Sequence, residues 1–164
     1  AKNLAAVQSL AQRYPGRVNL MLVPSASVVY PENVPAGAPQ IDEKSILEGV
    51  AAQGEAYGRF IDVLPTLTEH KEEYLYYRTD HHWTTLGAYY AYQQFCETLG
   101  LTPFDRDAHT AETCEDFYGT HYSKTRTWNA ETRHHYLVRP AEQSDGLERH
   151  RPGPAHRGHH HRPV

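Results

Sequence analysis

The sequence has few of the features that assign a chain to a protein class at first sight. Its two cysteines, Cys96 and Cys114, are too few for a disulfide framework and do not form a Cys-x-x-Cys pair. No apolar run is long enough to cross a membrane. Basic residues are also scarce, with 16 Lys and Arg against 20 Asp and Glu, and the charge of −4 argues against a general nucleic-acid-binding protein.

Large apolar side chains are rare in the last part of the chain. Residues 131–164 contain no Ile, Phe, Met or Trp, and six Arg against four acidic residues give them a charge of +2. Such a segment cannot bury enough apolar surface to offset the entropy lost on ordering. The preceding residues carry a charge of −6, from 10 basic and 16 acidic side chains, and are long enough for one domain. We therefore expect a domain over 1–130 and a disordered tail over 131–164.

The expected domain alternates between helical and strand patterns. Apolar residues at spacings of three and four predict helices over 2–14, from Asp42 to about 51, and from Thr84 or Thr85 to 99. Short apolar runs predict buried strands over 18–23 and 60–64. This order predicts an α/β layered sheet. The apolar face of the third helix is expected to consist of Ala88, Tyr92, Phe95 and Leu99.

The densest cluster of chemically active side chains is Asp80-His81-His82-Trp83, just before the third helix. In an extended or turn segment Asp80 and His82 would project to one side and His81 to the other. A carboxylate beside an imidazole fixes its tautomer and stabilises the imidazolium, which makes the pair the base half of a nucleophilic triad. The simpler interpretation is an exposed polar loop, although two adjacent His beside an Asp are uncommon in one.

Metal binding by the same cluster is a second interpretation, because Asp and His both ligate zinc or manganese. The remaining histidines, among them His70, His109 and His121, are scattered in the sequence and offer no regular ligand spacing. The His159-His160-His161 run is a flexible tract that would bind metal unspecifically. We predict neither a metal site nor a cofactor.

A nucleophile for the dyad is not evident. No Gly-x-Ser-x-Gly or Gly-Asp-Ser motif is present. Ser25 follows a proline and is typical of a turn, Ser123 has no distinctive context, and Cys96 lies near an apolar helix face and is typical of a core residue.

Two longer segments resemble one protein family. Residues 76–96 (YYRTDHHWTTLGAYYAYQQFC) and 116–124 (DFYGTHYSK) are similar to the DHHW proteins, and residues 22–35 (LVPSASVVYPENVP) resemble them as well. These proteins are bacterial cell-envelope relatives of the alginate O-acetyltransferases, in the SGNH-hydrolase-like superfamily. The resemblance implies a flavodoxin-like three-layer α/β/α sandwich, of which this chain supplies a part, with the site at the carboxyl ends of the strands.

The resemblance also implies roles for the residues of the cluster. Asp80 and His82 match the acid and base of a Ser-His-Asp triad, with Trp83 packing behind them and His81 as a further supporting residue. In this group the serine follows the Asp-x-His block, in a segment resembling Asp-Ser, and no such segment follows Trp83 in this chain. The chain therefore lacks the expected nucleophile.

The function implied by the resemblance is that of a carbohydrate O-acyltransferase or esterase. Its expected partner is a cell-envelope or exported polysaccharide, with no nucleic acid, no cofactor and an acyl donor that the sequence does not indicate. We expect an extracytoplasmic location, and a start at Ala1 rather than Met is compatible with a membrane anchor upstream. An Arg-, His-, Pro- and Gly-rich tail without Lys is typical of an out-of-frame reading of GC-rich DNA, so we hypothesise a frameshift near position 131.

Two alternatives remain open at this stage. A metal-dependent phosphoesterase of the Asp-His-His kind would need further aspartates at strand ends, for which Asp62 is the only candidate. A non-catalytic envelope or glycan-binding module is favoured by the missing serine and by the 12 tyrosines.

Overall fold

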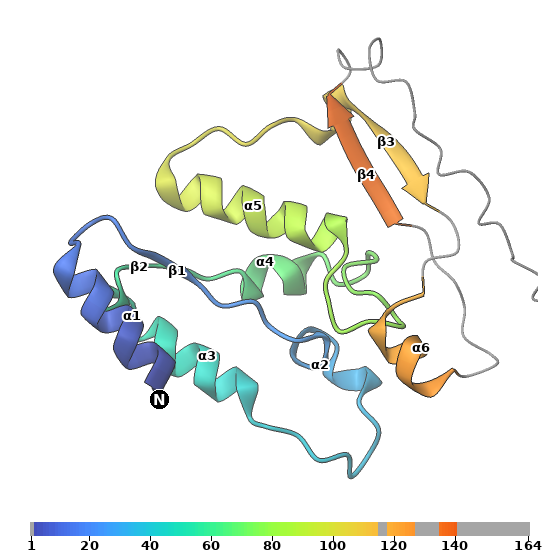
Figure 1. Cartoon of the computed structure of the whole chain (residues 1–164), viewed down its shortest axis with the longest axis horizontal. Coiled ribbons are helices and arrows are strands. Elements are labelled where there is room, and N and C mark those ends of the chain that lie inside the picture. Colours follow the sequence, from blue (N-terminus) through green and yellow to red (C-terminus); the bar gives the residue numbers. More distant parts are fainter. Residues whose placement is uncertain (1, 115–117, 127–134, 141–164) are drawn as a thin grey trace, which may run out of the picture.

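A computed structural model describes residues 2–114, 118–126 and 135–140 (Figure 1). The first half of the chain forms helix α1 (Lys2–Arg13), strand β1 (Asn19–Met21), helix α2 (Ala26–Val29), 3-10 helix η1 (Pro31–Asn33), helix α3 (Glu43–Ala51), 3-10 helix η2 (Gly54–Tyr57), strand β2 (Arg59–Ile61) and helix α4 (Leu64–Glu69). The second half forms helix α5 (Thr85–Leu99), 3-10 helix η3 (Arg106–Ala108), strand β3 (His109–Cys114), helix α6 (Thr120–Thr125) and strand β4 (His135–Pro140).

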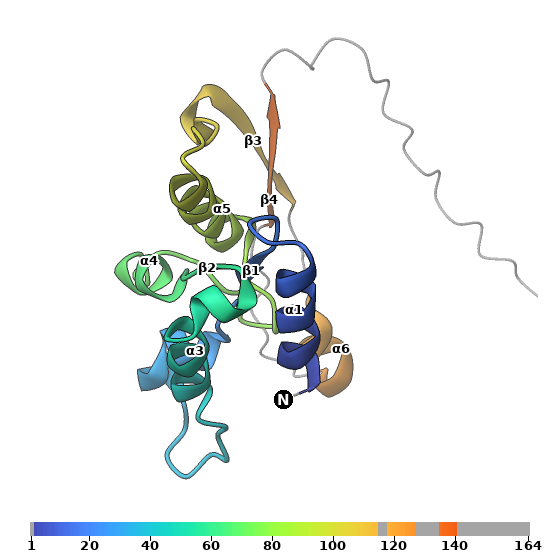
Figure 2. The same cartoon turned by 90° about the vertical axis from the view of Figure 1, so that its left-hand side faces the viewer.

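The two expected strands are present and pair in parallel. Asn19 of β1 lies opposite Arg59 of β2, and Met21 lies opposite Ile61. Each strand has three residues and is shorter than expected, in the second case because Asp62 accepts a hydrogen bond from the Leu64 N–H (3.1 Å) and α4 begins at Leu64. Figures 1 and 2 show α5 and α1 on opposite sides of this pair. Within the described residues the parallel sheet has these two strands and no more.

A second sheet continues beyond the expected domain boundary. β3 pairs with β4 in antiparallel fashion, from His109 opposite Pro140 to Cys114 opposite His135. β4 lies within the segment that we assigned to a disordered tail, so a strand is present at His135–Pro140, past the boundary at 130. The apolar run Tyr-Leu-Val at 136–138 was the signal, because such residues favour strands even within a polar segment. The remainder of the expected tail, 141–164, lies outside the described residues.

One hydrophobic cluster joins the elements around the parallel strands. Its buried members come from α2, β2, α4, α5 and the segment before α5, and they are Val29, Ile61, Val63, Leu67, Leu75, Tyr76, Tyr90 and Ala91. The buried face of α5 differs from the expected one: Gly87, Tyr90, Ala91 and Cys96 are buried. The expected stripe of Ala88, Tyr92, Phe95 and Leu99 is only partly buried. The Tyr92 hydroxyl accepts a hydrogen bond from the Phe104 N–H (3.1 Å), on the chain that follows the helix.

The ends of α5 are as the sequence predicts. The Thr84 side chain caps the first turn by accepting a hydrogen bond from the Gly87 N–H (3.2 Å). Gly100 ends the helix in the left-handed conformation, with φ of 67°, which glycine adopts without steric cost. The N-terminal cap fixes where the preceding segment, residues 76–83, joins the helix. None of the described helices has both the length and the apolar character needed to span a membrane.

Candidate functional site

The Asp-His-His-Trp cluster lies on a tight loop that leads into α5. Tyr76 and Trp83 form an antiparallel bridge, and the Tyr77 N–H donates to the His82 carbonyl (3.2 Å). One step closer to the helix, the Thr84 N–H donates to the Leu75 carbonyl (2.7 Å). These bonds close the loop at its base and leave Asp80, His81 and His82 at its tip.

Asp80 is a buried carboxylate with both oxygens hydrogen-bonded. Its Oδ1 accepts from the His82 backbone N–H (2.9 Å) and is also in close contact with Nδ1 of the His82 ring. Its Oδ2 accepts from the Thr120 backbone N–H (2.7 Å). The residue is 8 % exposed, so these partners replace the water that an ionised carboxylate needs.

The surroundings of Asp80 favour its charged form. Burial raises the pKa of this carboxyl, but the backbone N–H groups of Thr120 and His82, and their side chains, together lower it well below its usual value. Asp80 therefore stays ionised at neutral pH. An ionised Asp80 holds the His82 ring with Nδ1 facing the carboxylate and leaves Nε2 for chemistry at the surface, because the His82 side chain is 63 % exposed.

His81 does not point away from this pair, as a strand-like loop would require. Its ring lies beside that of His82, with ring centres 3.9 Å apart, and its Nδ1 is 3.7 Å from Oδ1 of Asp80. The alternation that we expected of an extended or turn segment does not hold here, because the chain forms a turn at residues 78–79 and bends at 80–82. Trp83 is partly buried and packs against the hydrophobic cluster, so it lies behind the loop.

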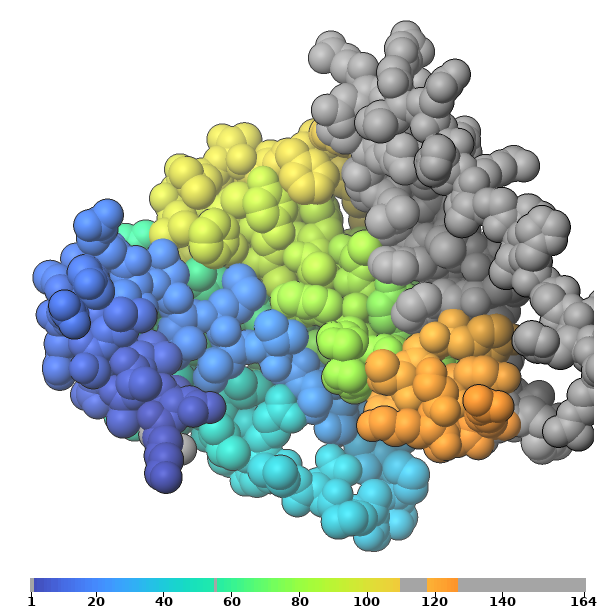
Figure 3. All heavy atoms as spheres, in the orientation of Figure 1, coloured from blue at the N-terminus to red at the C-terminus, as the bar shows by residue number. Residues whose placement is uncertain are grey.

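The start of α6 completes the site, although no role could be assigned to it from the sequence. The Gly119 N–H donates to Thr79 Oγ1 (3.2 Å) and the His121 N–H to the Thr79 carbonyl (2.9 Å). A Cβ atom at Gly119 would lie 2.4 Å from Cβ of Asp80, so only glycine allows this approach. Figure 3 shows α6 seated against the segment that contains Asp80. The family resemblance of residues 116–124 was the available signal for this segment. The contact between Thr120 and Asp80 could not be predicted, because the two residues are 40 positions apart in the sequence.

The candidate nucleophiles lie elsewhere. Ser25 donates its hydroxyl to Glu43 Oε2 (2.6 Å), and its N–H donates to Oε1 of the same carboxylate (2.8 Å). Ser123 donates to the Gly119 carbonyl (3.2 Å), and Cys96 is buried. Within the described residues, no serine hydroxyl is hydrogen-bonded to His82.

The groups that could hold a metal ion gather at the same loop. Asp80, His81 and His82 each place one ligand atom within 4.8 Å of the others. His121 lies near these residues, with its ring centre 5.9 Å from that of His81. Asp62, the aspartate that a phosphoesterase would need, is instead bonded to the Leu64 N–H at the start of α4.

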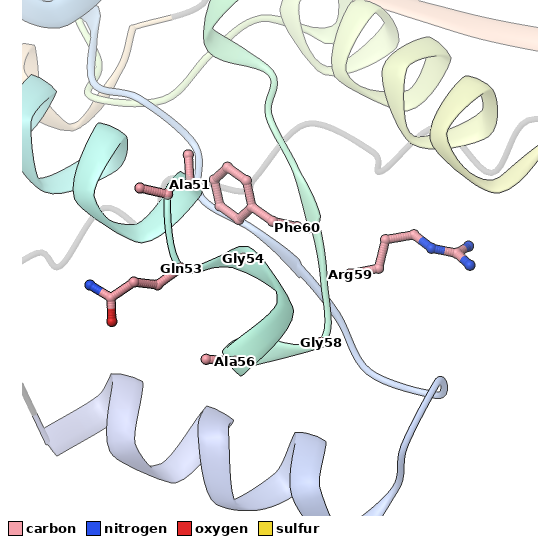
Figure 4. Close-up of a pocket in the computed structure, with 8 residues that line it drawn as sticks. Ala51, Gln53, Gly54, Ala56, Gly58, Arg59 and Phe60 are labelled. Carbon is pink, nitrogen blue, oxygen red and sulfur yellow. The ribbon is translucent and has the colours of Figure 1, made fainter.

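Of two hollows on the surface, one includes residues of this site and the other does not. A groove of about 630 Å³ includes Asp80 and His121 and is lined by tyrosines such as Tyr30 and Tyr76. A second hollow, of about 610 Å³, lies beside the amino end of β2 at Gly58 and Arg59 (Figure 4). Ligands of open α/β sheets bind beyond the carboxyl ends of the strands, which favours the groove at Asp80.

This architecture is shared with a class of solved acyl-transfer and related proteins. The structure is similar to the O-acetyltransferase domain of Pseudomonas putida AlgJ, with a TM-score of 0.63 and 23 % identity over 87 % of this chain and 57 % of that one. It is also similar to Bacillus cereus PatB1, solved with a sulfonyl adduct, with a TM-score of 0.65 and 16 % identity over 85 % of this chain and 49 % of that one.

The family is shown by a match to a family model, and a further solved structure carries the same family description. A DHHW family protein from Eubacterium siraeum superposes with a TM-score of 0.71 and 27 % identity over 85 % of this chain and 47 % of that one. The model of the DHHW protein family matches residues 5–140, and the chain belongs to this family. The resemblance seen in the sequence is thereby confirmed. A search of curated proteins gives no match. The chain spans about half the length of the solved relatives.

Proposed function

We propose that this chain carries the acid–base half of a Ser-His-Asp site for O-acyl transfer to, or deacylation of, a cell-envelope or exported polysaccharide. The observation that carries the proposal is the buried Asp80 bonded to the exposed His82. The Thr120 N–H supports it by occupying the second carboxylate oxygen, so that Asp80 faces His82 through Oδ1 alone. The similarity to an O-acetyltransferase domain supports the reaction class.

In the proposed mechanism His82 is the general base. Its Nε2 takes the proton from a serine hydroxyl supplied by a part of the protein outside the described residues, while the serine oxygen attacks the acyl carbonyl. Asp80 stabilises the resulting imidazolium, and backbone N–H groups stabilise the oxyanion. His82 then gives the proton to the leaving alcohol. A sugar hydroxyl or water then attacks the acyl-serine while His82 takes its proton. His82 returns this proton to the serine oxygen as the acyl–serine bond breaks, which restores the serine.

The finer points of the fold and the location belong to the same proposal. We propose that β1 and β2 are part of a larger three-layer α/β/α sandwich, as the helices on both sides of the pair suggest. The proposed site of action is extracytoplasmic, in keeping with a polysaccharide substrate. Sequencing the gene across codon 131 tests the frameshift hypothesis on its own.

The experiment that tests the function uses a protein extended to the length of the solved relatives, with a downstream serine segment. Hydrolysis of a chromogenic acetyl ester is measured for the parent protein, for His82→Ala and for Asp80→Asn. Both variants are expected to lose about 10⁴-fold in kcat while the folded structure persists, since removal of a triad member has effects of this size. The matched control is His109→Gln, because the Nδ1 atom of His109 contacts the carbonyl of Asp105 (2.7 Å), just before η3, and not the cluster at Asp80.

Two outcomes would overturn the proposal. Turnover that survives in His82→Ala would remove His82 from the mechanism. Binding of polysaccharide without any turnover, in a protein that contains the serine, would favour the glycan-binding module instead.

A further inference from the structure

The structure places His121 beside three consecutive residues, Asp80, His81 and His82, from which it is separated in the sequence. His121 comes from the first turn of α6, while Asp80, His81 and His82 come from the loop before α5. The rings of His81 and His121 lie with their centres 5.9 Å apart, and the rings of His81 and His82 lie 3.9 Å apart. The hydrogen bonds of α6 to Thr79 and Asp80 hold His121 at this place.

One pair of donor atoms in the cluster has the spacing that a small divalent ion requires. Ligands at 2.0–2.1 Å around a tetrahedral zinc ion are separated from one another by about 3.4 Å. The Asp80 Oδ1 and His81 Nδ1 atoms are 3.7 Å apart, close to this value. His81 Nδ1 also lies 2.9 Å from Thr120 Oγ1, a hydrogen-bond contact that an ion would replace. The His81, His82 and His121 side chains are exposed, so their rings can turn toward an ion without disturbing the core.

The chemistry of the donors selects the class of metal. Imidazole nitrogens suit zinc, copper and nickel, whereas magnesium and calcium prefer sites made of oxygen ligands. A carboxylate anchored by backbone N–H groups, like that of Asp80, is held in a fixed position, as ligands of metal sites usually are.

We propose that Asp80, His81 and His82 bind a zinc-class divalent cation, with His121 as the fourth ligand, in a state that replaces the Asp80–His82 hydrogen bond. The two states exclude each other because the ion and the direct contact between Oδ1 and the His82 Nδ1 require the same space. The metal state inhibits the reaction because it removes the base, His82, from its carboxylate. This statement about inhibition rests on the proposed function. The metal site itself does not rest on it.

The test titrates the full chain with zinc sulfate in competition with a chromophoric chelator. The parent for all variants carries His159→Gln, His160→Gln and His161→Gln, so that the terminal histidine run does not contribute. We expect binding of one ion, and at least about tenfold weaker binding in His81→Gln, His121→Gln and Asp80→Asn. His109→Gln, outside the cluster, is the control and should bind as the parent does. Ring NMR signals of His82 should shift as zinc displaces the Asp80 contact.

The outcomes separate this inference from the proposed function. Zinc binding that is unchanged in both His81→Gln and His121→Gln would overturn the metal site and leave the dyad in place. A separate measurement on the zinc-free chain tests the dyad: a His82 Nδ1 proton signal should persist in His81→Gln and be absent in Asp80→Asn. Zinc or manganese that copurifies in stoichiometric amount and resists the chelator would support the site and overturn the acyl-transfer function.

Discussion

The carboxylate of Asp80 ties the loop before α5 to the first turn of α6, and its ionisation is therefore linked to stability. Because its pKa is lower in the folded chain than in the unfolded one, the ionised group stabilises the fold above about pH 4. This contribution is lost as the pH falls below that value toward the lower pKa of the folded state. We expect the free energy of unfolding to drop more steeply between pH 6 and pH 3 in the parent chain than in Asp80→Asn. Denaturant titrations at both pH values measure this difference, and equal slopes would contradict it.

Gly119 is a second residue on which the site depends. In Gly119→Ala the new Cβ would lie 2.4 Å from both Cβ of Asp80 and the Thr79 carbonyl oxygen, so α6 has to move away. We expect a loss of about 1–3 kcal/mol in the free energy of unfolding, as for other overpacked positions, together with a rise of the Asp80 pKa as the Thr120 bond is lost. Urea denaturation and carboxyl NMR measure the two effects.

Gly49→Ala in α3 is the matched control. No atom lies within 4 Å of a Cβ at Gly49, and alanine is the better helix former by about 1 kcal/mol. This variant should therefore be as stable as the parent chain or more so. A Gly119→Ala variant that behaves in the same way would show that α6 is not clamped to Asp80.

The sequence predicts contacts between residues that are close together in the chain, but not contacts between residues that are far apart in it. The contact between Asp80 and His82 follows from their spacing, because residues two apart in a short loop can face one another. The position of His81 was predicted wrongly, since alternation of side chains holds in an extended strand and not in the turn and bends at residues 78–82. The roles of Gly119 and Thr120 depend on a packing contact that no local pattern encodes.

Helix α5 depends on its N-terminal cap, which also holds the loop of the site. Thr84 is 4 % exposed; its hydroxyl accepts from the Gly87 N–H (3.2 Å) and donates to the Tyr74 carbonyl (2.7 Å). We expect Thr84→Ala to lower the free energy of unfolding by about 0.5–2 kcal/mol, the usual range for a lost cap. Thr84→Ser keeps the hydroxyl and should recover most of the loss. Thermal unfolding followed by circular dichroism measures both, and equal losses in the two variants would show that the hydroxyl is not what matters.

The ends of helix α5 were easier to predict from the sequence than the face that it buries. The ends of α5 are set by Thr84 and Gly100, whose local chemistry acts wherever the helix packs. Its buried face is set by what covers it, and the cluster around Leu67 and Leu75 favours Tyr90 and Ala91 over the expected stripe. The second strand was predicted too long because α4 begins at Leu64, three residues after the end of β2.

Across the whole molecule, the hydrophobic cluster joins the parallel strands, three helices and the segment that carries the site. Leu75 belongs to this cluster, and its carbonyl accepts the Thr84 N–H at the base of the loop. The parallel pairing of β1 with β2 was predictable as an α/β pattern, whereas the pairing of β3 with β4 was not, because the composition of residues 131–164 obscured the second strand. Stability and the geometry of the site should accordingly respond together to changes in the core.

Leu67 provides the test of this coupling, since its side chain is fully buried (0 % exposed) in α4. Leu67→Ala should lower the free energy of unfolding by about 2–5 kcal/mol, the usual cost of truncating a core leucine. Leu10→Ala in α1 is the matched control, because Leu10 is 48 % exposed and surface changes are usually within about 0.5 kcal/mol. With increasing urea, the helical signal and the His82 ring proton signal should disappear at one midpoint in each chain, and that midpoint should fall only in Leu67→Ala. A His82 signal lost well before the helical signal would show that the loop unfolds independently of the cluster.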